Sequence, residues 1–365
     1  MNVISFFTGA GGLDIGLKQA GFDIKLAAEL VPTYCETVKI NDPEINIRQG
    51  DIMDYSRERI YEEAKLDEHA EVDLMVGGSP CQSFSTAGRG LAFEAAGGAA
   101  MLKFADLVTE VQPRVFLLEN VRGFLSAPLR RRPGKEKGDG FPPLEPDEMR
   151  GAAMEYLLTR FPDYEITSEL LNSANFGVPQ KRERVFLVGF RKDLERKFVF
   201  PETTHNEHGT EGKDRWVTVR DVFNRLGKID HHHVNYSETR MKYMKMIPVG
   251  GGNWRDLPED IVEDAMGGAF KSGGGKVGYF RRLHIDRPSP TVLTTPAQNS
   301  TNLGHPFENR PLSIEEYLAI QEFPSNYVVS GTLAQQYTQV GNAVPIRLAK
   351  AMGTAIISQL AEVEE

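Results

Sequence analysis

The first 200 residues alternate apolar runs of strand length with amphipathic stretches of helix length, and this alternation restricts the fold more than any other feature. It is typical of a parallel sheet with helices on both faces, because parallel strands must be joined by crossovers. The pattern therefore predicts an α/β fold with a doubly wound sheet. Its seven strands are expected at residues 3–7, 24–30, 46–48, 72–76, 115–118, 165–171 and 185–190.

The regular pattern stops near residue 204, where histidine, glycine and tryptophan interrupt shorter apolar runs. Two glycine triplets follow and mark turns. We expect the sheet domain at 1–203, a smaller, irregular and mostly-β domain at 204–290, and a return segment at 291–365. The C-terminal helix of that segment, at 346–360, is predicted to pack back on the first domain.

Composition narrows the class of protein. Of the 365 residues 40% are hydrophobic, which allows a sizeable core, and no apolar run reaches the roughly 18 residues of a membrane helix. The N-terminus enters a strand without a basic signal segment, so we expect a cytoplasmic protein with no membrane association. The only two cysteines, Cys35 and Cys81, make a disulfide framework implausible. No metal site is expected, since His231, His232 and His233 lack the cysteines that would complete one.

The net charge of -9 argues, at face value, against a polyanionic partner. The distribution of charge matters more than its sum. Arg130, Arg131 and Arg132, followed by Lys135 and Lys137, form a basic segment. A solvated loop is the ordinary explanation of such a run.

A glycine-rich segment, Phe7-Thr8-Gly9-Ala10-Gly11-Gly12, follows the first strand and opens the first helix. Its spacing is tighter than the dinucleotide pattern G-x-G-x-x-G, which disfavours a pyrophosphate. Glu29 ends the second strand, where a ribose is held, and Asp51 follows the third, where an adenine amino group could donate to it. Each glycine alone fits a tight turn, but the trio describes an adenosine pocket without phosphate, which fits S-adenosylmethionine.

Cys81, in the segment Ser79-Pro80-Cys81-Gln82-Ser83, stands where the strand at 72–76 stops. Open α/β sheets keep their chemistry at that edge, so Cys81 is a candidate nucleophile. Taken alone, the segment fits a small buried hydrophobic residue equally well.

Glu119 ends the strand expected next to the one that carries Cys81. Burial at the sheet edge favours its protonated form, which makes it a candidate proton donor to a ring nitrogen. Arg182 and Arg184 are two residues apart, so their side chains share one side of an extended strand. They could bind a phosphate or a base carbonyl, or form a surface ion pair.

Five motifs together resemble the C5-cytosine DNA methyltransferases of bacterial restriction-modification systems. They stand in the order of that family and cover nearly the whole chain. The motifs are Phe7-x-Gly9-x-Gly11-Gly12, Pro80-Cys81-Gln82, Glu119-Asn120-Val121, Gln180-x-Arg182-x-Arg184 and Gly341-Asn342-Ala343-Val344.

The resemblance implies a Rossmann-like S-adenosylmethionine-dependent methyltransferase, with target recognition in 204–290. Cys81 would attack C6 of a flipped-out cytosine, and protonated Glu119 would hold N3 while C5 takes the methyl group. Arg184 would contact the flipped base, and Arg182 its phosphate or Glu119. Asn120 would position the turn at Pro80.

The resemblance also implies cofactor and DNA contacts. The expected cofactor contacts are Phe7, Gly9, Ala10, Gly11, Gly12, Glu29, Asp51, Ile52, Gly78, Pro80, Asn342 and Ala343. The expected DNA contacts are Gln82, Ser85, Arg89, Trp254 and Arg255. The implied partner is double-stranded DNA, bound by a monomer associated with the nucleoid. A cognate restriction endonuclease would act on the same site without direct contact.

Two departures from the family accompany the match. Ser5 stands where many members have an acid, and 127–150 looks like an insertion whose arginines contact DNA or remain solvated. A transfer RNA cytosine-5 methyltransferase shares several motifs and is one alternative. A non-catalytic DNA-binding regulator is another, although it would be expected to lack Cys81 or Glu119. The glycine spacing disfavours a nicotinamide oxidoreductase.

Overall fold

The computed structural model describes residues 1–79, 93, 96–136, 138, 140–227, 229–273 and 276–363. The chain divides into two compact units. The first comprises Met1–Asn172, Glu183–Glu202 and Ala349–Glu365, and the second comprises Ser173–Arg182 and Thr203–Leu348. In the described part of the chain, no helix has the length and apolar character needed to cross a membrane.

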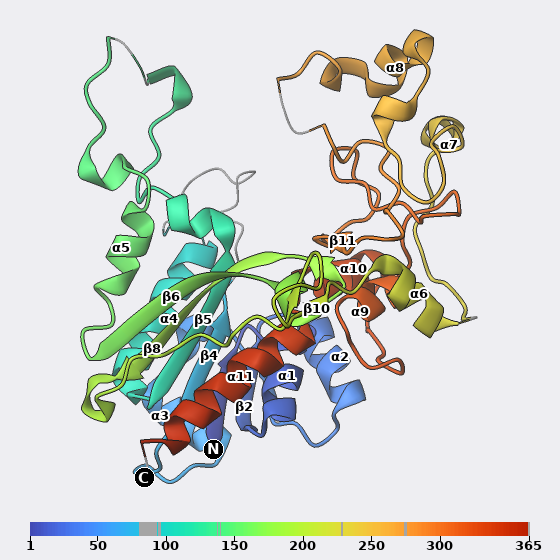
Figure 1. Ribbon diagram of the computed structural model, residues 1–365. Helices are drawn as coiled ribbons and strands as arrows, with labels where there is room; N and C mark the ends of the chain where they lie inside the picture. Colours follow the sequence, from blue (N-terminus) through green and yellow to red (C-terminus); the bar gives the residue numbers. More distant parts are fainter. Residues whose placement is uncertain are drawn as a thin grey trace. The chain divides into compact units, whose positions relative to one another are not determined.

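The first unit is built on a seven-stranded sheet with the strand order β3-β2-β1-β4-β5-β8-β6 (Figure 1). All seven predicted strands are confirmed: β1 (Asn2–Phe6), β2 (Asp23–Glu29), β3 (Ile47–Gln49), β4 (Leu74–Gly78), β5 (Val115–Val121), β6 (Tyr164–Asn172) and β8 (Glu183–Arg191).

The predicted parallel sheet has one exception in β8, which runs antiparallel to both β5 and β6. The connection from β6 to β8 is short, and it holds only the 3₁₀ helix η7 (Ser173–Phe176) and the two-residue strand β7 (Gln180–Lys181). A parallel connection needs a crossover of a dozen or more residues, usually a helix, so this link reverses the chain.

Helices cover both faces of the sheet. On one face α3 (Arg57–Ala64), α4 (Ala96–Val111) and α5 (Ala152–Leu158) share one apolar core with the strands. On the opposite face α1 (Gly12–Ala20) and α11 (Ile346–Ala361) lie side by side (Figure 1). A Cβ atom built at Gly353 of α11 would come within 2.9 Å of the Ala20 Cβ, so the predicted return of the C-terminal helix to the first domain is confirmed.

The remaining helix of this unit, α2 (Pro32–Asn41), follows β2 and carries the buried Cys35.

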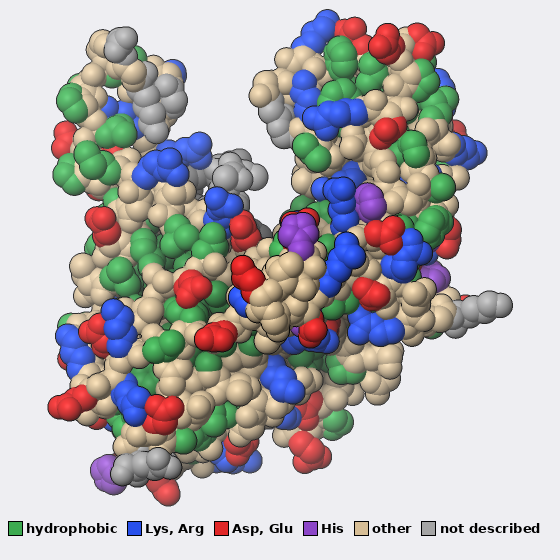
Figure 2. Space-filling view, in the orientation of Figure 1, with side chains coloured by type: hydrophobic (Ala, Val, Ile, Leu, Met, Phe, Trp, Pro, Cys, Tyr) green, Lys and Arg blue, Asp and Glu red, His purple; other side chains and the backbone are tan. Residues whose placement is uncertain are grey.

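Acidic and basic side chains are interspersed over the face of the first unit that Figure 2 shows. Surface charge of this mixed kind does not create a single-sign field over the sheet.

The second unit contains more helix than predicted. Residues 204–290 were expected to be mostly β, and this is wrong, because they contain α6 (Val219–Leu226), α7 (Glu238–Met244) and α8 (Glu259–Met266). Their strands are only two residues long: β9 (His205–Asn206), β10 (Asp214–Arg215) and β11 (Ser289–Pro290). Local capping explains α6 and α7, since Thr218 accepts from the Asp221 N–H and Ser237 accepts from the Arg240 N–H.

Residues 236–280 have a core of their own, made of Tyr236, Tyr243, Met244, Ile247, Leu257, Met266 and Phe280. The second unit also holds α9 (Ile314–Ile320) and α10 (Leu333–Asn342), which lie beyond the predicted boundary at 290.

A buried amide network explains why that boundary differs. Gln180 donates to Gln321 Oε1 at 2.7 Å and accepts from the Val292 N–H at 2.9 Å. Gln321 in turn donates to the carbonyls of Val340 and Ala343, at 2.7 and 3.0 Å. Because buried polar groups need partners, these bonds tie 291–343 to the segment around Gln180 and not to the sheet.

Candidate active site

The glycine-rich segment forms a loop of left-handed backbone between β1 and α1. Gly9 and Gly11 have φ values of 57° and 77°, a region that favours glycine. Phe7 also has a positive φ, of 60°, which is strained for a bulky side chain. The loop is closed by a 2.8 Å hydrogen bond from the Gly11 N–H to the Thr8 carbonyl. Its fixed shape is what the predicted cofactor loop requires.

Glu29 joins this loop to the end of β2. Its carboxylate accepts from the Gly9 N–H at 2.8 Å and from the Val31 N–H at 2.9 Å. Burial raises the pKa of Glu29, and these two N–H bonds act against that rise. A carboxylate bonded to the loop N–H would repel a phosphate there. The loop and Glu29 therefore suit a nucleoside without phosphate, as the sequence predicted.

The other predicted adenine-side residues follow β3. Asp51 caps the 3₁₀ helix η1 (Ile52–Asp54) by accepting from the Met53 N–H at 3.0 Å. Ile52 is buried beside it. This arrangement presents an acidic residue and an apolar residue together at the end of a strand next to β2.

Gly78 and Glu119 face each other at the ends of β4 and β5, two strands that were predicted to be neighbours. They are paired in the register of β4 with β5, and a Cβ built at Gly78 would lie 3.4 Å from Glu119 Oε2. Glu119 is only 6% exposed, and its Oε1 lies 2.8 Å from Nε of Arg184 on β8. The absence of a side chain at residue 78 leaves space beside a buried, ion-paired carboxyl group.

Asn120 anchors the end of β4. Its side-chain amide donates to the Ser79 hydroxyl at 2.9 Å, and both residues are buried. Its own Oδ1 accepts from the Val121 N–H at 2.8 Å. This contact reaches the residue before Pro80 and supports the positioning role predicted for Asn120. The predicted residues Pro80, Cys81, Gln82, Ser85 and Arg89 lie outside the described residues.

Arg182 and Arg184 have different surroundings, although they were predicted to share one side. Arg184 is the arginine that pairs with Glu119. Arg182 is 1% exposed and donates to the carbonyls of Val292, Gly341 and Asn342 at 3.2, 2.9 and 3.1 Å. The expectation that Arg182 binds a phosphate or orients Glu119 is therefore corrected to a structural role. Side-chain alternation holds only within one continuous strand, and Arg182 lies between β7 and β8.

Replacing Arg182 by methionine is expected to reduce the free energy of unfolding by about 3 kcal/mol, because three carbonyls would lose a charged donor. Urea denaturation measures this effect. The matched control is Arg122→Met, whose exposed ion pair with Glu183 should contribute less than about 1 kcal/mol. Equal losses in the two variants would contradict the role assigned to Arg182.

The remaining predicted residues lie in the second unit. Asn342 ends α10 and gives its carbonyl to Arg182, and Ala343 is buried after it. The Arg255 guanidinium lies 4.9 Å over the ring of Trp254. Cofactor contacts by Asn342 and Ala343 and DNA contacts by Trp254 and Arg255 stay predictions.

Two arginines of the predicted insertion, Arg130 and Arg132, form ion pairs. Arg130 bonds to Asp147 through Nε at 2.8 Å and Nη2 at 3.2 Å, and Arg132 bonds to the buried Glu148. The side chain of Arg130 is exposed and that of Arg132 is mostly buried, and DNA contact by the insertion stays a prediction. The ion pairs hold the two ends of the segment together.

The sequence reasoning missed Asp14 as a partner of Ser5. The Ser5 hydroxyl donates to Asp14 Oδ1, and Asp14 is only 2% exposed. Burial raises the pKa of Asp14 to about 6 from an ordinary 3.8. Ser5 stands where the family usually has an acid, and this could have indicated that another residue supplies the carboxyl group. That residue is Asp14, in the first turn of α1.

Asp14→Asn is expected to stabilise the protein at pH 8 and to have little effect near pH 4. A folded-state pKa above the unfolded value means that stability falls as pH rises from about 4 to about 6, by up to about 3 kcal/mol. Asparagine avoids that loss and keeps an oxygen for the Ser5 hydroxyl. Denaturant titrations at several pH values test this, and a gap between variant and wild type that does not change with pH would refute it.

A sheet of this topology, with a glycine loop after β1 and a buried carboxyl on β5, is typical of doubly wound proteins, which bind their ligands at the carboxyl ends of the strands. Residues 1–135 and 151–358 match the family described as C-5 cytosine-specific DNA methylase. The chain belongs to this family and is a DNA cytosine methyltransferase. The unmatched residues 136–150 fall inside the insertion predicted at 127–150.

Similar proteins agree with this assignment. The Type II methyltransferase M.Sau96I of Staphylococcus aureus is 36% identical over 98% of this chain and 76% of its own length. M.PspPI of a Psychrobacter species is 36% identical over 98% of this chain and 79% of its own. These relatives and the family match confirm the predicted family.

Solved structures confirm the predicted fold class. A prophage-encoded DNA modification methyltransferase from Escherichia coli has a TM-score of 0.66 and 24% identity, with 99% of each chain covered. Spodoptera frugiperda DNMT2 has a TM-score of 0.57 and 16% identity, with 98% of this chain and 99% of that one covered. At these identities the likeness shows the fold alone.

Proposed function

We propose that this enzyme transfers the methyl group of S-adenosylmethionine to C5 of one cytosine within a short, specific duplex DNA sequence. The observation that carries the proposal is the buried Glu119, ion-paired with Arg184 and facing Gly78, two residues before Pro80-Cys81. The glycine loop and Glu29 stand at the ends of β1 and β2, on the other side of β4 from Glu119. The methyl donor and the target cytosine would therefore come together at this edge of the sheet.

The cofactor would be held by the glycine loop, Glu29, Asp51 and Ile52. Gly9 already gives its N–H to Glu29, so the site offers a carboxylate where a phosphate-bearing cofactor would need a donor. S-adenosylmethionine has no phosphate and carries positive charge, and when bound it supplies an electrophilic methyl group. Gly78 would keep the approach to Glu119 open.

The chain's own residues would activate the base. The Cys81 thiolate forms a bond to C6 of the cytosine, and the electron pair displaced from the C5–C6 double bond makes C5 nucleophilic. Glu119 donates to N3 and offsets the negative charge that develops there, and Arg184 keeps the Glu119 carboxyl in place. After C5 is methylated, loss of the C5 proton breaks the C6–sulfur bond and restores the ring. The cytosine must leave the duplex for C6 to be reached.

Methyl transfer can be tested directly with tritiated cofactor, mixed-sequence duplex DNA and bulk transfer RNA. We expect acid-stable label in the duplex and none in the RNA. Label in transfer RNA alone would favour the RNA alternative, and binding without label would favour a non-catalytic regulator.

The Type II names of the relatives support a role in restriction-modification, with a cognate endonuclease that reads the same site. The methylated sequence protects host DNA in such a pair. Bisulfite sequencing of a plasmid from cells that express the protein would identify the modified cytosine. We expect one short motif to be fully converted to 5-methylcytosine, and scattered partial methylation would contradict a restriction-modification role.

A further inference from the structure

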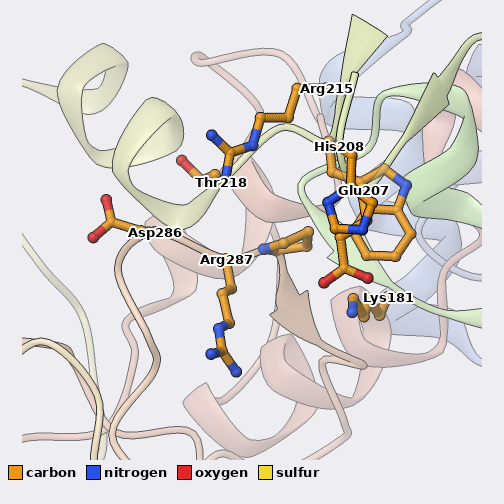
Figure 3. Close-up of a pocket in the computed structure, with 9 residues that line it drawn as sticks. Lys181, Glu207, His208, Arg215, Thr218, Asp286 and Arg287 are labelled. Atoms are coloured by element: carbon orange, nitrogen blue, oxygen red, sulfur yellow. The ribbon is translucent and has the colours of Figure 1, made fainter. Parts of the chain in front are cut away.

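A cationic pocket in the second unit has no part in the chemistry described above. It has a volume of about 310 Å³ and is shown in Figure 3. Three separate segments line it: Lys181 on β7, residues 207–218 around β10, and Asp286 to Pro288 before β11. The first and third segments are joined because β7 pairs with β11.

Three cationic side chains and two acidic ones line the pocket. Lys181, Arg215 and Arg287 line it, and none of them forms an ion pair with a carboxylate in the part of the chain that the structure describes. The nearby Asp286 is already paired with Arg220 at 2.7 Å. Glu207 is the other acid in the lining. Unpaired cations gathered around one cavity, in a chain of net charge -9, favour an anionic ligand.

The walls of the pocket are held in place before any ligand binds. The Asn206 side-chain oxygen accepts from the N–H groups of His208, Gly209 and Thr210, at 3.1, 2.7 and 3.1 Å. The Trp216 ring nitrogen donates to Asn175 at 2.9 Å, and the Lys181 ammonium lies 4.2 Å from the centre of that ring. The indole therefore restricts Lys181 through a cation–π contact, which leaves the ammonium group able to donate hydrogen bonds.

We propose that this pocket binds the DNA backbone, with Lys181, Arg215 and Arg287 contacting phosphates that flank the recognised sequence. This inference rests on the proposed function. A phosphodiester suits the site because its oxygens accept from ammonium and guanidinium groups alike. Lys181 and Arg287 have exposed side chains, which a continuous polyanion can reach.

The salt dependence of DNA binding tests the assignment. Lys181→Gln, Arg215→Gln and Arg287→Gln, separately and together, are titrated with cognate and unrelated duplexes between about 50 and 200 mM salt. Each cation lost should reduce the slope of log affinity against log salt by about 0.9, equally for both duplexes. The control is Lys25→Gln, a half-buried lysine paired with Asp23 at the start of β2, which should keep the wild-type slope and activity.

A second arm distinguishes DNA from a free anion as the source of phosphate. Thermal unfolding is followed with inorganic phosphate alone. Protection of the wild type that the triple variant lacks, combined with unchanged DNA slopes, would assign the pocket to a small anion and overturn the proposal. Unchanged slopes without protection would overturn it as well. If the wild type labels no DNA at all, the proposed function has failed and not this inference.

Discussion

Cys81→Ser is expected to lower the rate of methyl transfer by about 10⁴-fold or more, while S-adenosylmethionine still binds. The reason is that a thiolate is the attacking species, and a serine hydroxyl remains un-ionised at neutral pH. Without the group that forms the covalent bond, the enzyme loses the entire covalent pathway and not only a part of its rate enhancement. Rates are measured with tritiated cofactor on the cognate duplex, and cofactor binding by calorimetry.

Cys35 provides the matched control. It is buried in α2 and 6% exposed, and burial raises its pKa to about 11, so it remains a thiol. Cys35→Ala should therefore retain activity. A duplex with 5-fluorocytosine at the target adds a direct measurement, because fluorine at C5 blocks the final elimination. The wild type and Cys35→Ala should be trapped on this duplex and Cys81→Ser should not. Substantial turnover by Cys81→Ser would show that the covalent route is wrong.

The sheet was predictable because its strands are nearly continuous apolar runs, which is the pattern of strands covered on both faces. The adjacency of β4 and β5 was predicted as well, but the approach of Gly78 to Glu119 was found only in the structure. The glycine loop was predictable for a different reason. Gly9 and Gly11 have left-handed backbone, which favours glycine, so the glycines themselves indicate this conformation in the sequence.

Features that depend on tertiary contacts were not predictable. Periodicity carries no information on strand direction, so the reversal of β8 needed the short link from β6 to be recognised as too short for a crossover. In an extended segment, Arg182 and Arg184 would have equivalent positions. Because the strand is interrupted between β7 and β8, the Arg182 side chain points elsewhere and donates to three backbone carbonyls. The boundary after 290 was missed because the glutamine network acts between residues more than a hundred positions apart.

Glu119→Gln is expected to reduce methyl transfer by about 10² to 10³-fold without weakening cofactor binding. Glutamine keeps the size of the side chain but has no acidic proton to transfer to N3. The loss should fall on the rate at saturating DNA more than on DNA affinity, because the contact strengthens as charge develops on the ring. Single-turnover rates and DNA titrations separate these two quantities.

Glu183→Gln is the matched control for this variant. Glu183 is three positions before Phe186, the residue of β8 that pairs with Glu119, and it forms an exposed ion pair with Arg122 at 2.8 Å. This variant makes the same chemical change, glutamate to glutamine, on the strand that carries Arg184. The Glu183→Gln enzyme should transfer methyl groups at the wild-type rate. Trapping on 5-fluorocytosine DNA sharpens the comparison, since Glu119→Gln should form the covalent adduct slowly and not lose it altogether. If Glu119→Gln instead loses DNA affinity and keeps its rate, the carboxyl group acts in binding the base and not in offsetting charge during attack.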